Sequence, residues 1–370
     1  MSGVREFQKR DIAEVADLWL RVFHGGRGPA PQAARDYFDE IFFQAPWRDD
    51  SLPSLVYEDE GRIGGFLGVL PRKMTFDKRP IRVAVATQLA EDEAARSAYA
   101  AVKLIKRFFA GPQDLSFSDG ANDSSERLWT ASGGNTALLY SLDWTRVLRP
   151  AEFARILLKS HKPFAPLARL LPPFCRVFDA AVLRSRLGSY WLPEADEGLV
   201  DEEPSDEMLL SCVRQFSGDR ALQPDYDTES FRWLLREAGD KRLHGSLRKA
   251  IVREESGEVA GWYLYYLQPG EVSEVLQFGG RPKSIRRVLN RLFYDSWKQG
   301  AVAVSGEMEP RFARELAKGR CTFNWTGGVL AQSNNLDLLN AIQRGDAFLS
   351  RLEGEWWARF SDSDWTRHKL

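Results

Sequence analysis

The most regular pattern of hydrophobic and polar positions lies in residues 81–109. From Ile81 to Leu89 apolar residues alternate with other residues, and a period of two predicts a β-strand. From Ala98 onward the apolar residues recur at steps of three and four, with Lys and Arg on the opposite side, so we expect an amphipathic helix. The unpaired N–H groups at the start of such a helix attract anions, and Arg96 precedes it. The sequence therefore predicts a phosphate site between this strand and this helix.

The order of elements around this unit occurs twice in the chain. In each half two helices precede a β-hairpin, a further strand and an amphipathic helix. The hairpin turn EDEG that starts at Glu58 has its counterpart EESG at Glu254. Repetition on this scale indicates a duplicated domain and not a short motif. We predict an N-terminal domain at residues 1–150, closed by a strand at 138–148, and a C-terminal domain at residues 205–370.

Residues 151–204 differ from both halves. Seven Lys or Arg and one Asp lie among apolar residues between positions 155 and 186, whereas residues 194–207 hold eight Asp or Glu and no basic residue. We interpret the first part as a basic helical segment and the second as an acidic linker. The basic helices could lie on a membrane surface. Packing against the two domains, with the acidic run neutralising the basic charge, is the favoured interpretation.

Composition narrows the class of protein. A chain of 370 residues with 44% hydrophobic residues has enough apolar material for two globular domains. The 51 Lys and Arg nearly balance the 52 Asp and Glu, so no global positive charge favours nucleic acid or membrane. Three widely spaced cysteines predict no disulfide framework and a reducing cytoplasm. Because no long apolar run is present we predict no membrane span, and four scattered histidines predict no metal site.

The order of elements resembles that of the GCN5-related N-acetyltransferase (GNAT) family. The resemblance covers residues 4–148 closely and 206–335 more loosely, and it implies an α+β fold: two tandem GNAT-like domains, each a mixed, mostly antiparallel twisted sheet flanked by helices. Members bind the pyrophosphate of acetyl-coenzyme A (acetyl-CoA) with a Q/R-x-x-G-x-G/A turn. The matching residues here are Arg96, Ser97, Ala98, Tyr99, Ala100 and Ala101. Tyr99 stands where the family has glycine, which lets the backbone approach a phosphate closely.

The resemblance also assigns roles at the ends of the two central strands. Trp129 takes the place of a tyrosine that often acts as general acid, and an indole cannot protonate a thiolate. Tyr99 and Asp119 are the nearest replacements as catalytic groups, although an aspartate in such a turn more commonly caps it. The other residues that the resemblance places at the cofactor are Gln88, Leu89 and Asn122.

Three functions follow from this resemblance. The favoured one is an acyltransferase that moves an acyl group from acyl-CoA, with acetyl-CoA first among the donors, to an amine of a small molecule or sugar. We expect the first half to hold the cofactor, because the GGRPKS turn of the second half lacks the family spacing. A tandem pair is also similar to Fem-type aminoacyl or peptidyl transferases, which use aminoacyl-tRNA, and the basic segment could hold RNA phosphates. The third is a catalytically silent acyl-CoA-binding protein, and in each case we expect a monomer or homodimer.

Overall fold

The structure is a computed structural model that describes residues 3–26, 28–97, 99–160, 171–185, 188–194, 196, 198–325 and 327–358. Taking these residues only, the chain forms two compact units. Unit 1 lies within positions 1–141, 220–243 and 327–370, and unit 2 within positions 142–219 and 244–326. No described helix combines the length and the apolar character needed to cross a bilayer.

Unit 1 is built on an eight-stranded sheet with the strand order β1-β2-β3-β4-β5-β15-β6, and β9 pairs with β3. Its strands are β1 (Gly3–Glu6), β2 (Leu55–Asp59), β3 (Arg62–Phe76), β4 (Arg79–Glu91), β5 (Leu115–Ala121), β6 (Asn135–Thr136), β9 (Leu222–Pro224) and β15 (Gly328–Gln332). Its main helices are α1 (Ile12–His24), α2 (Gln32–Asp39), η2 (Glu40–Gln44), α3 (Glu93–Ser97), α4 (Ala100–Phe109), α5 (Asp123–Ala131), α11 (Thr228–Asp240) and α14 (Leu336–Gln343). The pairs are antiparallel except β4 with β5, which run parallel.

Unit 2 is built on a seven-stranded sheet with the order β14-β7-β13-β12-β11-β10-β8, in which β12 and β13 run parallel. Its strands are β7 (Leu142–Val147), β8 (Leu199–Glu202), β10 (Ser246–Glu254), β11 (Val259–Leu267), β12 (Val272–Gly280), β13 (Ala303–Glu307) and β14 (Thr322–Trp325). Its main helices are α6 (Pro150–Ser160), α8 (Pro172–Arg184), α9 (Gly188–Trp191), α10 (Asp206–Ser217), α12 (Ile285–Lys298) and α13 (Ala313–Lys318). The predicted α+β class, with two mixed and mostly antiparallel sheets flanked by helices, is confirmed.

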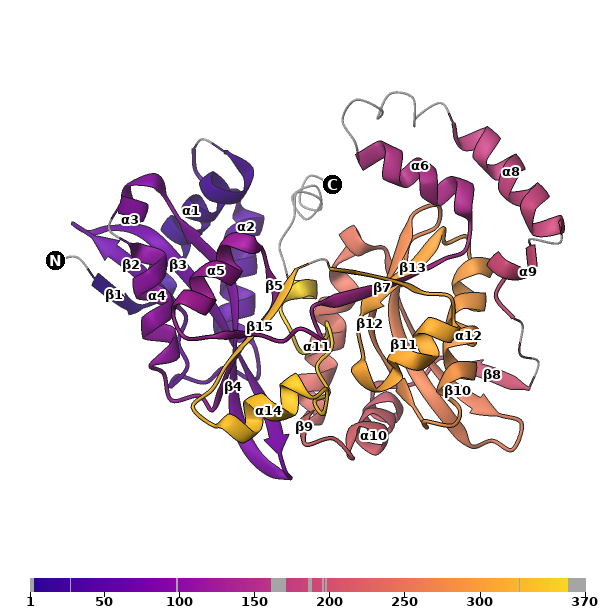
Figure 1. Ribbon diagram of the computed structural model, residues 1–370. Coiled ribbons are helices and arrows are strands. Elements are labelled where there is room, and N and C mark those ends of the chain that lie inside the picture. Colours follow the sequence, from indigo (N-terminus) through magenta and orange to yellow (C-terminus); the bar gives the residue numbers. More distant parts are fainter. Residues whose placement is uncertain are drawn as a thin grey trace. The chain divides into compact units, whose positions relative to one another are not determined.

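Each sheet contains strands from the opposite half of the chain: β9 and β15 in unit 1, and β7 in unit 2. β7, in magenta, lies between β13 and β14 among the orange strands of unit 2, and β15 lies between β5 and β6 in unit 1 (Figure 1). The strand expected at residues 138–148 is therefore present, but it does not close a domain at residues 1–150. Helix α11, expected in the C-terminal half, likewise belongs to unit 1. The two units are discontinuous in sequence because Trp144 of β7 is buried in the core of unit 2 and Leu330 of β15 in the core of unit 1.

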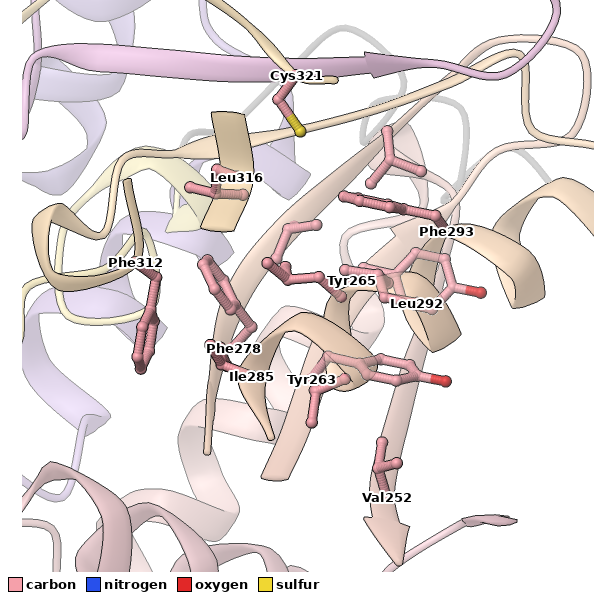
Figure 2. Close-up of a cluster of buried hydrophobic side chains, with 14 of the residues drawn as sticks. Val252, Tyr263, Tyr265, Phe278, Ile285, Leu292, Phe293, Phe312, Leu316 and Cys321 are labelled. Carbon is pink, nitrogen blue, oxygen red and sulfur yellow. The ribbon is translucent and has the colours of Figure 1, made fainter. Parts of the chain in front are cut away.

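Large side chains from the strands and the helices of unit 2 fill its core. Figure 2 shows Phe278, Phe312, Leu316 and Tyr263 among the buried side chains of this cluster. Trp144 of β7 is fully buried in the same cluster. An aromatic residue at these positions occupies space that a ligand would need, so the core of this unit serves packing.

The core of unit 1 joins α4 to the central strands. Leu104, Ile105 and Phe108 of α4 pack with Leu67 of β3 and Ala84 of β4. Their spacing of one, three and four residues is the amphipathic pattern that the sequence predicts for this helix. The predicted strand at 81–89 and the helix beginning near residue 98 are thus observed as β4 and α4.

A buried carboxylate in unit 1, next to a partly exposed one, makes the stability of the unit depend on pH. Glu237 of α11 is 6% exposed, and burial, followed by the charge of Glu40, raises the pKa of Glu237 from 4.5 to about 7. The folded state thus binds this proton more tightly than the unfolded state. The contribution of Glu237 to the free energy of unfolding is complete below about pH 4.5 and is lost as the pH rises through about 7.

We expect Glu237→Gln to remove this loss and to leave the variant about 2 kcal/mol more stable than the wild type at pH 8, with little gain at pH 4.5. Urea unfolding at both pH values measures the difference. Glu229→Gln, on the exposed side of the same helix, is the matched control. An equal decline with pH in the wild type and in Glu237→Gln would contradict the assignment.

Candidate functional site

The two parallel strands of unit 1 separate and leave a cavity between them. β4 and β5 pair at Val83–Leu115, Ala84–Ser116 and Val85–Phe117, and the pairing ends there although both strands continue. The cavity in this region has a volume of about 300 Å³. Its wall is formed by Trp19, Phe23, His24, Leu67, Ala86, Thr87, Gln88, Leu89, Ile105, Ser118, Gly120, Ala121, Asn122, Ser125, Trp129, Leu330 and Glu355. A space of this kind, lined by apolar groups and a few polar ones, is suited to a small ligand.

The end of β4 presents unsatisfied polar atoms at this cavity. The pairing of β3 with β4 shifts between Phe66 and Gly68, and Gln88 has a positive φ of 51°. Thr87 Oγ1 and Gln88 Oε1 are buried and have no hydrogen-bond partner among the described residues. Buried polar atoms in folded proteins nearly always have a partner, so these two atoms point to a ligand or an ordered water.

Tyr37 of α2 fixes the orientation of the Gln88 side chain. Gln88 Nε2 donates a hydrogen bond to Tyr37 Oη, which in turn donates to the carbonyl oxygen of Ala358 at 2.8 Å. Because the amide nitrogen is engaged, the amide oxygen remains available as an acceptor. The distorted end of β4 therefore offers an acceptor whose position is held by a second side chain.

Glu355, in the C-terminal segment of unit 1, supplies a carboxylate to the same cavity. Its side chain is 5% exposed, and its Oε1 accepts a hydrogen bond from Ser118 Oγ at 2.8 Å. It is the one carboxylate among the described lining residues, which include no Lys or Arg. A carboxylate can pair with a cationic group of a ligand or accept a proton from it.

Asp119 of β5 holds this segment in place. Its Oδ1 accepts the N–H of Glu355 at 2.6 Å, and its Oδ2 accepts the N–H of Trp356 at 3.4 Å. A Cβ atom at Gly354 would lie 1.9 Å from the Asp119 carboxyl group, so this approach requires glycine. The geometry thus gives Asp119 a positioning role for Glu355.

The predicted phosphate site at the start of α4 is occupied by a carboxylate of the protein. Glu91 Oε2 accepts the N–H of Ala101 at 3.0 Å, and Arg96 Nε lies 3.7 Å from Glu91 Oε1. Asp92 Oδ1 accepts the N–H of Ala95 at 2.9 Å. The site does favour an anion, as the sequence predicts, but a phosphate must compete with Glu91.

Tyr99 immediately precedes α4 in the left-handed conformation, with φ 55° and ψ 42°. Glycine adopts this conformation without strain, and a bulky side chain does so at a cost of about 1 kcal/mol or more. The side chain is 71% exposed. The backbone therefore has the shape that the family's glycine provides, even though the residue is tyrosine.

The structure brings only some of the predicted site residues together. Gln88, Leu89 and Asn122 line the cavity, and Asn122 also caps α5 by accepting the N–H groups of Ser124 and Ser125. Five other predicted residues do not line the cavity and lie where α3 ends and α4 begins: Arg96, Ser97, Tyr99, Ala100 and Ala101. Ala98 lies outside the described residues. The catalytic roles assigned to Asp119 and Tyr99 stay predictions, and neither residue lines the cavity.

Glu355 is the functional candidate that the sequence does not reveal. It lies in the run RLEGEWW, where Trp356 and Trp357 indicate core or interdomain packing. No periodic pattern marks Glu355, and its place at the cavity depends on contacts with Ser118 and Asp119, more than 230 positions away. The only local signal is a pair of glutamates within an apolar run, since a buried carboxylate needs a reason to be there.

Solved structures share the fold of this chain. No protein family's sequence profile matches the chain, and no curated protein matches it in sequence. A "probable N-acyltransferase" from Enterococcus faecalis V583 superposes with a TM-score of 0.60 at 11% identity, over 90% of this chain and 73% of that one. A GCN5-related N-acetyltransferase from Anabaena variabilis ATCC 29413 gives 0.57 at 11% identity, over 91% and 74% of the two chains.

A third structure, a GCN5-related N-acetyltransferase from Kribbella flavida, gives a TM-score of 0.55 at 10% identity over 90% of this chain and 70% of that one. At such low identity these likenesses concern the fold alone. The chain has the GNAT fold, and its two sheets fit a tandem arrangement of it, as the sequence predicts.

Proposed function

We propose that unit 1 is an acyltransferase that moves an acyl group from acyl-CoA to an amine of a small molecule or sugar. The observation that carries the proposal is the separation of β4 from β5 beyond Val85 and Phe117, over a cavity bordered by unsatisfied acceptors. The thioester arm would lie along the free edge of β4, with the phosphates near Arg96. Support for the thioester class comes from the GNAT fold of the neighbours named above.

Glu355 would act as the proton acceptor in this reaction. A primary amine is protonated near neutral pH, with an ordinary pKa of about 10.4, and must lose a proton before it can attack. The Glu355 carboxylate takes this first proton. The neutral nitrogen then bonds to the thioester carbonyl carbon, the carbon–sulfur bond breaks with its electrons going to sulfur, and a second proton passes from the nitrogen to the leaving thiolate. Thr87 and Gln88 offer further acceptors for an ammonium group, since both have a free oxygen at the cavity.

The hydrogen bond from the Ala101 N–H to Glu91 favours the two alternative functions, a Fem-type transferase and a silent binding protein. Its carboxylate holds the N–H group that the family uses for pyrophosphate, which would weaken the binding of coenzyme A. A Fem-type transferase that uses aminoacyl-tRNA, or a silent binding protein, would tolerate this contact. Copurified tRNA with an affinity that falls steeply with salt would support the Fem-type function.

Isothermal titration calorimetry with acetyl-CoA and longer acyl-CoAs tests the proposed donor. We expect binding that Arg96→Glu weakens by about tenfold, because this change replaces an attractive charge with a repulsive one, worth about 1.4 kcal/mol. Glu91→Gln should strengthen binding by a few fold, because it removes the competing carboxylate. Arg107→Glu, an exposed position near the other end of α4, is the matched control. If none of the thioesters gives a heat of binding, the proposed function is wrong.

A further inference from the structure

Helix α8 of unit 2 presents a group of apolar side chains to solvent. Phe174, Val177 and Phe178 are 71%, 72% and 60% exposed. Positions separated by three and four residues lie on neighbouring parts of a helix surface, so these side chains form one patch. Single exposed apolar residues are common on protein surfaces, but a contiguous group of large ones marks an interaction site.

The opposite face of α8 is anchored, which fixes the patch toward solvent. Asp179 is 3% exposed and accepts the N–H groups of Ala151 and Glu152 at 2.8 and 3.0 Å, at the start of α6. Packing against unit 2, the interpretation favoured from the sequence, therefore accounts for the Asp179 side of α8. It does not account for the face that carries Phe174 and Phe178.

The solvent-facing charge of α6 and α8 is positive. The two acidic residues of these helices, Glu152 and Asp179, are 4% and 3% exposed, and Glu152 pairs with Arg155 at 2.6 Å. Arg176 pairs with the same carboxylate at 3.6 Å and lies on the Asp179 side of α8, although its side chain is 79% exposed. Arg184 at the end of α8 is also exposed. The exposed charged side chains of the two helices are therefore basic, with no exposed carboxylate on either helix within the described residues.

We propose that α8 docks on the surface of an anionic lipid bilayer. Its apolar patch would enter the boundary between headgroups and acyl chains while Arg184 meets a lipid phosphate, which is how interfacial amphipathic helices bind. A helix of 13 residues is about 20 Å long and lies in the surface without crossing it. The proposal does not depend on the acyltransferase activity of unit 1. It requires both the apolar and the basic groups, which a purely apolar partner surface would not.

Co-sedimentation of the full-length protein with lipid vesicles tests this proposal. We expect binding to an equal mixture of phosphatidylcholine and phosphatidylglycerol, little binding to phosphatidylcholine alone, and about a fivefold loss of the bound fraction when salt is raised from about 0.1 to 0.5 M. The double variant Phe174→Ser/Phe178→Ser should reduce binding about tenfold. Arg184→Glu should weaken it only for the anionic vesicles.

Leu336→Ser on α14 is the matched control, because Leu336 is 72% exposed and belongs to unit 1, not to the helix that carries the patch. Thermal unfolding of each variant by circular dichroism checks that the fold is retained, which the exposure of both phenylalanines leads us to expect. Equal binding to neutral and anionic vesicles, or no binding to either, would overturn the proposal. So would a wild-type dimer in light scattering that the double variant dissociates, since the patch would then be covered by a second copy.

Discussion

Glu355→Gln is expected to lower kcat for amine acylation by about a hundredfold or more, because general acid–base groups contribute about 10² to 10⁴ in rate. Glutamine keeps the size of the side chain and can still accept the hydrogen bond from Ser118, but it cannot take a proton from the amine. Steady-state kinetics with a thioester that calorimetry shows to bind, and a set of primary amines, measure the loss. The rate of the variant should also rise with pH toward the pKa of the free amine, since only the amine deprotonated in solution can then react.

Two further measurements separate proton transfer from a purely structural effect of Glu355. Glu355→Gln should leave thioester affinity and the melting temperature nearly unchanged, whereas a disordered segment would lower both. Asp337→Asn, on the exposed side of α14, is a charge-matched control that should leave kcat unchanged. Thioester binding together with unchanged kinetics in Glu355→Gln would remove Glu355 from the reaction while leaving the proposed function standing.

Trp144→Ala is expected to lower the free energy of unfolding of unit 2 by about 4 kcal/mol, as for other large-to-small changes of buried aromatic residues. Trp144 is fully buried, its ring makes edge contacts with Phe278 and Phe293 at centroid distances of 6.0 and 5.9 Å, and its Nε1 donates to the Glu307 carbonyl at 3.0 Å. The change would leave a cavity in the hydrophobic cluster beside β7. Urea unfolding followed by circular dichroism measures the effect.

The matched control for this prediction is Trp325→Ala in the neighbouring strand β14. Trp325 is 48% exposed, so its removal should cost less than about 1 kcal/mol. A similar loss in the two variants would argue against β7 as an interior strand of the unit 2 sheet, between β13 and β14. A large loss for Trp144→Ala alone would support the exchange of strands between the halves of the chain.

The sequence alone predicts those features that depend on neighbours in the chain. The alternation at 81–89 and the three-to-four-residue spacing that follows predict β4 and α4. A strand and a helix each need one apolar face, and residues close together in the sequence form that face. The recurrence of the same element order predicts two sheets of one kind. The anion preference at the start of α4 also follows from the sequence, because unpaired N–H groups occur at the start of any helix.

Other features were decided only by the tertiary structure. β7 and β15 each pair in the sheet of the opposite half, and no local pattern could show this, because backbone hydrogen-bonding groups are the same in every strand and pairing depends on distant partners. The sequence favours packing of the basic helices against the domains. In the structure Asp179 binds the start of α6, and Phe174 and Phe178, on the opposite face of α8, are exposed.

The segment at residues 81–109 has features of both kinds: some that the sequence predicts and some that depend on the tertiary structure. Its strand, helix and anion site are local and were predictable. Its cavity and its carboxylate are not, since they exist only where β4 parts from β5 and where Asp119 and Ser118 bind a segment from the far end of the chain. Periodicity can place an element, but only the folded chain brings together groups that are more than 230 positions apart.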